Sequence, residues 1–145
     1  MKKIIGMLGI TLSLTLVIHA QEKKHAQVKP TQEAKAGFES KFPGATNVKW
    51  EKEDDMLEVN FKQGGKEMSA LFETNGTLTE TETEIAVTAL PASASAYMKQ
   101  HYAGKKVKEA AKIVKADGSV NYEAEVEKKD VLFDADGKFI KEAKD

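Results

Sequence analysis

The feature that most constrains the fold of this chain is a sequence pattern that occurs twice. Two pairs of segments match in order and spacing: "GFESKFPGATNVKW" (37–50) with "YMKQHYAGKKVKEA" (97–110), and "LFETNGTL" (71–78) with "LFDADGKF" (132–139). A repeated sequence pattern predicts two structural units with the same order of short helices and strands. We therefore predict two tandem units, residues 31–85 and 90–145, within a single domain over 31–145.

Each unit begins with an expected helix. In the first unit, Ala34, Phe38 and Phe42 recur at the four-residue spacing that places side chains on one helix face. Thr31 precedes this stripe as an N-cap, and the proline and glycine that follow Phe42 end the helix. In the second unit the equivalent stripe is formed by Leu90, Ala94, Met98 and Tyr102. Both helices are apolar on one side only, so each needs a flat surface to cover.

Four short segments follow each helix and alternate between apolar and polar residues, the period of a β-strand. In "MLEVNFK", for example, Leu57, Val59 and Phe61 fall on one face. The polar residues on the opposite face of this segment and of "SVNYEAEVE" are Glu58, Asn60, Lys62, Asn121, Glu123 and Glu125. Such alternation is typical of antiparallel sheets with one covered and one wet face. We predict an α+β fold of two tandem helix-plus-antiparallel-β repeats, with both helices packed on one face of an antiparallel sheet.

The segment "TLTETETEI" carries Glu80, Glu82 and Glu84 in alternation with threonines. A comb of carboxylates suits a solvated or edge strand, where charge opposes aggregation. We predict that role for this strand, and no acid–base catalysis by its carboxylates.

Asp134, Asp136 and Gly137 fit either the start of a calcium loop or a tight turn between two strands. A loop of the EF-hand type needs an oxygen ligand at its fifth position, which is Lys138 here, and a glutamate at its twelfth. Asp-Gly between apolar strands is a strong hairpin signal, because both central residues of the turn can take a positive φ. We therefore predict a hairpin turn, and neither a metal nor another cofactor.

Residues 1–20 have the form of a secretory signal peptide, with lysines at positions 2 and 3, an uncharged apolar run, and Ala20 at the exit. We predict cleavage after Ala20, with Ala26 as an alternative. The chain has no cysteine to carry a lipid, and the apolar run is shorter than a membrane span requires. The expected location is periplasmic or secreted, without membrane insertion after cleavage, and residues 21–30 form a flexible lead-in.

Composition excludes several classes of function. All 22 cationic residues are lysine, and the net charge of the full chain is −1. Without arginine or a basic patch, nucleic-acid binding is disfavoured. Without cysteine there is no disulfide framework, thiolate metal site or cysteine nucleophile.

Few side chains remain for catalysis. His101 stands at the end of the second helix, where a histidine is favourable against the helix dipole. Ser93 and Ser95 lack the glycines of a nucleophile elbow. We therefore expect no enzyme activity.

Trp50 has two possible roles. A large ring near Phe38 and Phe42 is expected in the core beneath the first helix, although tryptophan is also enriched at binding hot spots. The core is the favoured interpretation, and an exposed interface anchor is the alternative.

The order of helix, "FPGA", tryptophan-bearing strand and "LFDADGK" hairpin, in tandem behind an export signal, resembles the PepSY-like family. Its members are also described as similar to β-lactamase inhibitor proteins. The resemblance implies an exported α+β domain with two helices against an antiparallel sheet. Function is implied only by analogy of fold.

Together these observations predict a non-catalytic exported binding module that contacts or inhibits another envelope or secreted protein. The alternative is a periplasmic domain that binds a small ligand or a cation, and the oligomeric state stays open. The possible interaction surface consists of Glu58, Asn60, Lys62, Asn121, Glu123, Glu125 and Trp50.

Overall fold

The computed structural model describes residues 27–144. The signal peptide expected at 1–20 and most of the predicted lead-in lie outside the described residues. In the described part, no helix is both long enough and apolar enough to cross a membrane.

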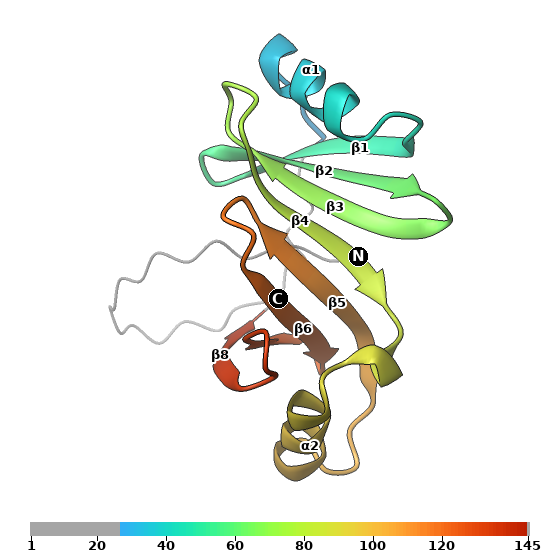
Figure 1. The fold of residues 1–145 in the computed structure, drawn as a ribbon, viewed down its shortest axis with the longest axis vertical. Coiled ribbons are helices and arrows are strands. Elements are labelled where there is room, and N and C mark those ends of the chain that lie inside the picture. The colour runs from blue at the N-terminus through green and yellow to red at the C-terminus, as the bar shows by residue number, and fades with distance from the viewer. Residues whose placement is uncertain (1–26, 145) are drawn as a thin grey trace, which may run out of the picture.

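The sheet is a meander of eight strands in which every strand pairs antiparallel with its neighbour in the sequence (Figure 1). In chain order the elements are α1 (Gln32–Lys41), β1 (Thr46–Glu53), β2 (Met56–Gln63), β3 (Lys66–Phe72), β4 (Leu78–Ile85), the 3-10 helix η1 (Val87–Ala89), α2 (Ala92–His101), β5 (Val107–Lys115), β6 (Val120–Val126), β7 (Lys129–Phe133) and β8 (Phe139–Lys144). The predicted α+β class and the antiparallel sheet are confirmed.

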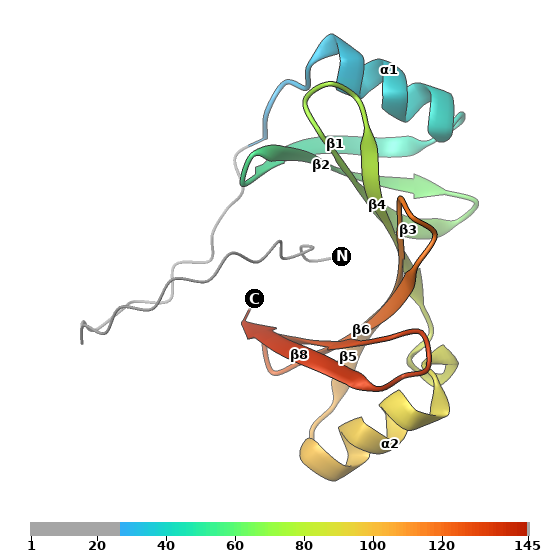
Figure 2. The same ribbon diagram turned by 60° about the vertical axis from the view of Figure 1, so that its left-hand side comes forward.

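The sheet is bent, and both helices lie on its outer, convex side (Figure 2). Each helix covers its own apolar cluster. The cluster under α1 contains Phe38, Trp50, Phe61 and Phe72, among others. The cluster under α2 is built from Leu90, Ala94, Met98, Ala110, Ala124, Val126, Val131 and Phe133. The helices and both core clusters occupy the outer side. The inner, concave face carries acidic side chains together with a few buried apolar ones, Leu71, Ala111 and Ile113.

Phe38 organises the cluster under α1. Its ring packs edge-on against Trp50 at a centroid distance of 5.6 Å and against Phe61 at 5.0 Å. Edge-to-face pairs of this kind are favourable because the positive edge of one ring meets the negative face of the other. Trp50 is only 7% exposed, so the core interpretation is confirmed and the exposed interface anchor is wrong.

Three hairpin turns share one geometry, in the loops that connect β3 to β4, β5 to β6 and β7 to β8. In the last, the Asp134 amide donates to the Lys138 carbonyl and the Gly137 amide donates to the Asp134 carbonyl, both at 2.9 Å. The hairpin prediction is confirmed, but two positive φ angles were expected and only the glycine has one, at 78°. A three-residue loop needs the left-handed conformation at its last position alone.

The predicted flexible lead-in is partly wrong. Gln27 pairs antiparallel with Glu51, and the Val28 amide donates to the Trp50 carbonyl at 3.0 Å. Val28 also packs against the cluster under α1. These contacts add a short piece of chain to the outer edge of β1, because an edge strand offers backbone groups that another segment can satisfy.

Thr31 joins the start of α1 to the hairpin between β3 and β4. Its side-chain oxygen accepts from the Ala34 amide at 3.1 Å, as predicted for the N-cap, and its hydroxyl donates to the Thr74 carbonyl at 2.6 Å. We expect Thr31→Ala to lose about 1–2 kcal/mol of unfolding free energy, because both hydrogen bonds disappear. Urea denaturation measures this loss. Thr31→Ser keeps the hydroxyl and should stay near the parent, and equal losses for the two variants would contradict the prediction.

Candidate functional site

The acidic side chains of the strands lie mainly on the inner face of the sheet. Cross-strand partners share a face, so the pairing register assigns each residue to it. The acidic residues on this face are Glu51, Glu53, Glu58, Glu67, Glu80, Glu82, Glu84, Glu109, Glu123, Glu125 and Asp130. The lysines on it are Lys49, Lys62, Lys115 and Lys141. The carboxylates outnumber the lysines, so the face is strongly negative.

The centre of the inner face is buried, contrary to the predicted wet surface. Glu58 is 1% exposed, and Glu123 and Glu125 are 6% and 5% exposed. Of the other predicted surface residues, Asn60 and Asn121 are half-buried and Lys62 is exposed. Alternation correctly assigns these residues to one face. It carries no information on the bend of the sheet, which brings side chains of neighbouring strands together.

Glu82 and Asp130 belong to the same buried centre, at 3% and 2% exposed, and sequence reasoning missed both. The strand of Glu82 was expected to be solvated or to lie at an edge. In the structure β4 pairs with β3 on one side and with β5 on the other, so it is a central strand. Because threonines alternate with its glutamates, the sequence of this strand is polar on both faces, which is typical of a solvated strand. The only available signal was the position of this strand before the second helix, which places it where the two units meet.

Burial and mutual repulsion raise the pKa of two of these carboxyls. The pKa of Glu82 rises to about 8, first because the group is desolvated and then because Glu58, Glu80 and Asp130 are nearby. The pKa of Glu123 rises to about 10, again by desolvation first and then by Glu82 and Asp130. Both side chains therefore hold a proton at neutral pH.

Glu82 and Glu125 differ in their polar contacts. Among the described residues, Oε2 of Glu82 has no hydrogen-bond partner. Glu125 is held by Lys108, whose Nζ lies 3.4 Å from its Oε1. Titratable groups with strongly raised pKa values in a cluster are more frequent at functional sites than elsewhere. The arrangement suits recognition of positive charge.

The candidate catalytic residues are not brought together. His101 is exposed on α2 and stacks on Tyr97, with ring centroids 4.1 Å apart. Ser93 donates its hydroxyl to the Asp136 carbonyl, which ties the start of α2 to the β7–β8 turn. Ser95 lies half-buried on the same helix.

Asp134, which would be the first ligand of a calcium loop, closes the predicted hairpin turn instead. Oδ1 of Asp134 accepts from the amides of Asp136 and Lys138, both at 2.9 Å, and so closes the turn. Within residues 27–144, no group of three histidine, cysteine, aspartate or glutamate side chains is placed to hold a metal ion.

Comparison with known proteins gives one family and several similar folds. The family model described as beta-lactamase-inhibitor-like, PepSY-like matches residues 55–141. A search of curated proteins gives no match.

A solved BLIP-like protein from Bacteroides fragilis is 24% identical, with 81% of this chain and 87% of that chain covered and a TM-score of 0.65. A protein from Bacteroides eggerthii described as periplasmic is 12% identical, with 81% and 90% covered and a TM-score of 0.72. A DUF2874 family protein from Bacteroides uniformis is 15% identical, with 80% and 90% covered and a TM-score of 0.70.

At these identities the solved structures show the shared fold alone. The family match begins just before β2, so α1 and β1 precede it, and it continues into β8. It spans more than half of the sequence. This chain therefore belongs to the PepSY-like, beta-lactamase-inhibitor-like family.

Proposed function

We propose that the protein is an exported, non-catalytic binding module that uses the inner face of its sheet to contact another envelope or secreted protein. The observation that carries this proposal is the excess of carboxylates on that one face. A one-sign surface on a rigid sheet steers an oppositely charged partner and selects against a like-charged one.

The inner face divides into a buried centre and an accessible rim. Around the buried Glu58, Glu82 and Glu123 lie acidic residues that are half-buried or exposed, including Glu80 and Glu84. The rim would make the contacts, and its ionised carboxylates would supply the negative potential. The partner should therefore present lysine or arginine side chains at its contact surface.

Three observations support an exported role. The N-terminal sequence has the pattern of a secretory signal, and the chain belongs to the PepSY-like family. A protein of similar fold from Bacteroides eggerthii is described as periplasmic. Inhibition of an envelope enzyme is the form of binding that the family description suggests for this module.

The two halves would act together. A helix followed by four strands occurs twice in the element order, and each half has its own core cluster. We infer that the tandem units 31–85 and 90–145 form one domain, since β4 and β5 join them in a single sheet. The binding face thus runs across both units.

A pull-down tests this proposal. The exported chain with a C-terminal affinity tag is incubated with envelope extract, and retained proteins are identified by mass spectrometry. The test variant carries Glu80→Lys and Glu84→Lys on β4. Because these changes reverse charge on the rim, we expect a partner retained by the parent to be lost or to bind at least tenfold more weakly.

The matched control reverses charge elsewhere. Glu33 and Glu39 are exposed residues of α1, which lies on the outer side of the sheet. Glu33→Lys with Glu39→Lys changes the net charge by the same amount and should retain the partner. Equal loss in the control, or equal retention by the rim variant, would rule out the inner face as the binding surface.

A further inference from the structure

The two edges of the sheet carry exposed apolar side chains. Val48, on edge strand β1, is 39% exposed. Phe139 and Ile140, on the opposite edge strand β8, are 42% and 47% exposed. These residues lie outside the inner face and are not used by the function proposed above.

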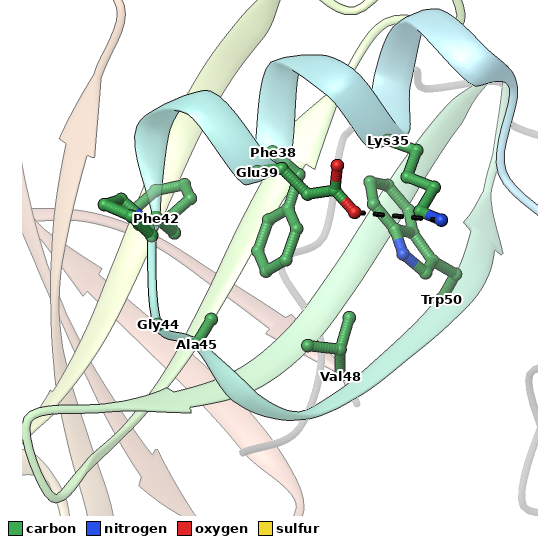
Figure 3. A pocket seen from close by; sticks show the side chains of 9 residues that line it. Lys35, Phe38, Glu39, Phe42, Gly44, Ala45, Val48 and Trp50 are labelled. Carbon is green, nitrogen blue, oxygen red and sulfur yellow. Dashed lines mark ion pairs between the residues drawn. The ribbon is translucent and has the colours of Figure 1, made fainter.

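The apolar surface at β1 is concave. A pocket of about 290 Å³ opens between α1 and β1, with the rings of Phe38, Phe42 and Trp50 around it and Val48 and Ala45 along β1 and its preceding turn (Figure 3). Lys35 and Glu39 lie on the helix side, with their charged atoms 3.7 Å apart. The pocket is thus apolar inside, with one ion pair beside it.

An irregularity in β1 accompanies this pocket. Asn47 has a φ of 55°, and the pairing of β1 with β2 skips from Thr46 to Lys49. A bulge of this kind redirects the side chain that follows it. Val48 lines the pocket as a result, instead of holding a regular place in the ladder. The neighbouring part of the edge, at Trp50 and Glu51, is used by Val28 and Gln27.

The apolar surface at β8 projects from the other end of the sheet. Phe139 pairs with the buried Phe133 and stacks on Tyr97 of α2, with ring centroids 4.8 Å apart and planes 9° apart. These contacts fix Phe139 on the outer side of the sheet, the side that also carries the β1 pocket. Ile140 follows it, where the pairing register of β7 and β8 shifts.

Strand direction makes these two edges compatible. In a meander of eight strands the last runs antiparallel to the first. A β8 edge beside the β1 edge of another copy therefore continues the antiparallel pairing, and keeps both outer faces on the same side. Within one chain this contact is not made, because the sheet is open and β1 and β8 are its two opposite ends.

We propose that the pocket between α1 and β1 receives the apolar side chains of β8, Phe139 and Ile140, from a second copy of this chain. The contact joins two different surfaces and is therefore head-to-tail. With one small pocket and a short edge it falls in the class of weak, transient interfaces, so assembly should depend on concentration.

Sedimentation velocity on the full exported chain tests the proposal by complementation. Val48→Asp blocks the β1 side and leaves β8 intact, whereas Ile140→Asp blocks β8 and leaves β1 intact. Each variant alone should be monomeric at concentrations where the parent self-associates. An equimolar mixture should form a heterodimer, because the two intact surfaces can still meet.

Val87→Asp is the matched control. Val87 is 37% exposed, like Val48, but belongs to η1 and to neither edge strand. It should self-associate as the parent does, and circular dichroism confirms that all three variants are folded. A parent that stays monomeric at its highest soluble concentration would overturn the proposal, as would a Val48→Asp chain that still self-associates. Neither result bears on the inner face, which the pull-down tests separately.

Discussion

Gly137→Ala is expected to lower the unfolding free energy by about 3 kcal/mol, whereas the same change at Gly118 should cost about 1 kcal/mol. Both glycines end a three-residue hairpin loop and both have a positive φ, 78° at Gly137 and 82° at Gly118. An alanine in this conformation brings its Cβ too close to the following carbonyl oxygen, which accounts for the shared part of the cost.

The difference arises from what each glycine faces. A Cβ at Gly137 would lie 2.7 Å from Cβ of Pro91 and 2.9 Å from the amide nitrogen of Ala94, and it would also meet the Ser93 hydroxyl. A Cβ at Gly118 would have no atom within 4 Å. The β7–β8 turn would have to move away from the first turn of α2, with loss of the hydrogen bond from Ser93 to the Asp136 carbonyl.

Chemical denaturation of the two alanine variants measures this difference directly, since the two glycines have nearly the same backbone conformation.

A similar close contact between a hairpin glycine and the start of a helix exists in the first half of the chain. A Cβ at Gly76 would lie 2.8 Å from the backbone carbon of Glu33 at the start of α1, so Gly76→Ala should resemble Gly137→Ala. Losses at 76 and 137 no greater than at 118 would show that the hairpin tips do not hold the helices in place.

Much of this fold could be predicted from local patterns. Ala94 and Met98 of the predicted stripe are buried on α2 as expected, because four-residue spacing places side chains on one side of a helix. Leu90 is also buried, but it precedes the helix, and Tyr102 is half-buried at its end. The two expected helices and the strands around them occur close to their predicted positions, since alternation and Asp-Gly turns report on backbone geometry over a few residues. The size of Trp50 and its expected place near Phe38 and Phe42 favoured the core, where the structure places it.

The candidate site could be predicted only in part, because solvent exposure depends on the whole sheet. Glu58, Glu123 and Glu125 share a face as predicted, but their burial follows from the bend of eight strands, which no short pattern encodes. The central position of Glu82 depends on the pairing of β4 with β5, a contact between the two predicted units. The pairing of Val28 with Trp50 was missed for the same reason, since "QEKKHAQVKP" has the composition of a free segment.

The second large effect concerns pH, and it follows from the buried carboxyls of the inner face. We expect the unfolding free energy to fall as the pH rises from about 5 to 8, by about 1.4 kcal/mol per pH unit for each proton that only the folded state retains. The pKa of Glu82 is raised from 4.5 to about 8, and that of Glu123 from 4.5 to about 10. Between these limits the folded protein binds more protons than the unfolded chain, so raising the pH favours unfolding.

Urea denaturation at pH 5, 6, 7 and 8 measures the slope, and two variants assign it. Glu82→Gln has nearly the same shape as the protonated side chain and cannot ionise, so it should flatten the profile and exceed the parent in stability at pH 8. Glu84→Gln changes an exposed residue on the same strand and the same face, and should follow the parent. Lys115 and Lys141 act to lower the pKa of Glu80, but desolvation prevails there and raises it.

The direction of the slope distinguishes two views of the inner face. A parent whose stability falls with pH, together with a flatter Glu82→Gln profile, means that the isolated protein keeps this face partly neutral. The face then gains charge when a cationic partner arrives, and binding releases protons. A parent whose stability is constant or rises from pH 5 to 8 would mean that Glu82 is already ionised in the folded state, and the inner face would carry its full negative charge before any partner binds.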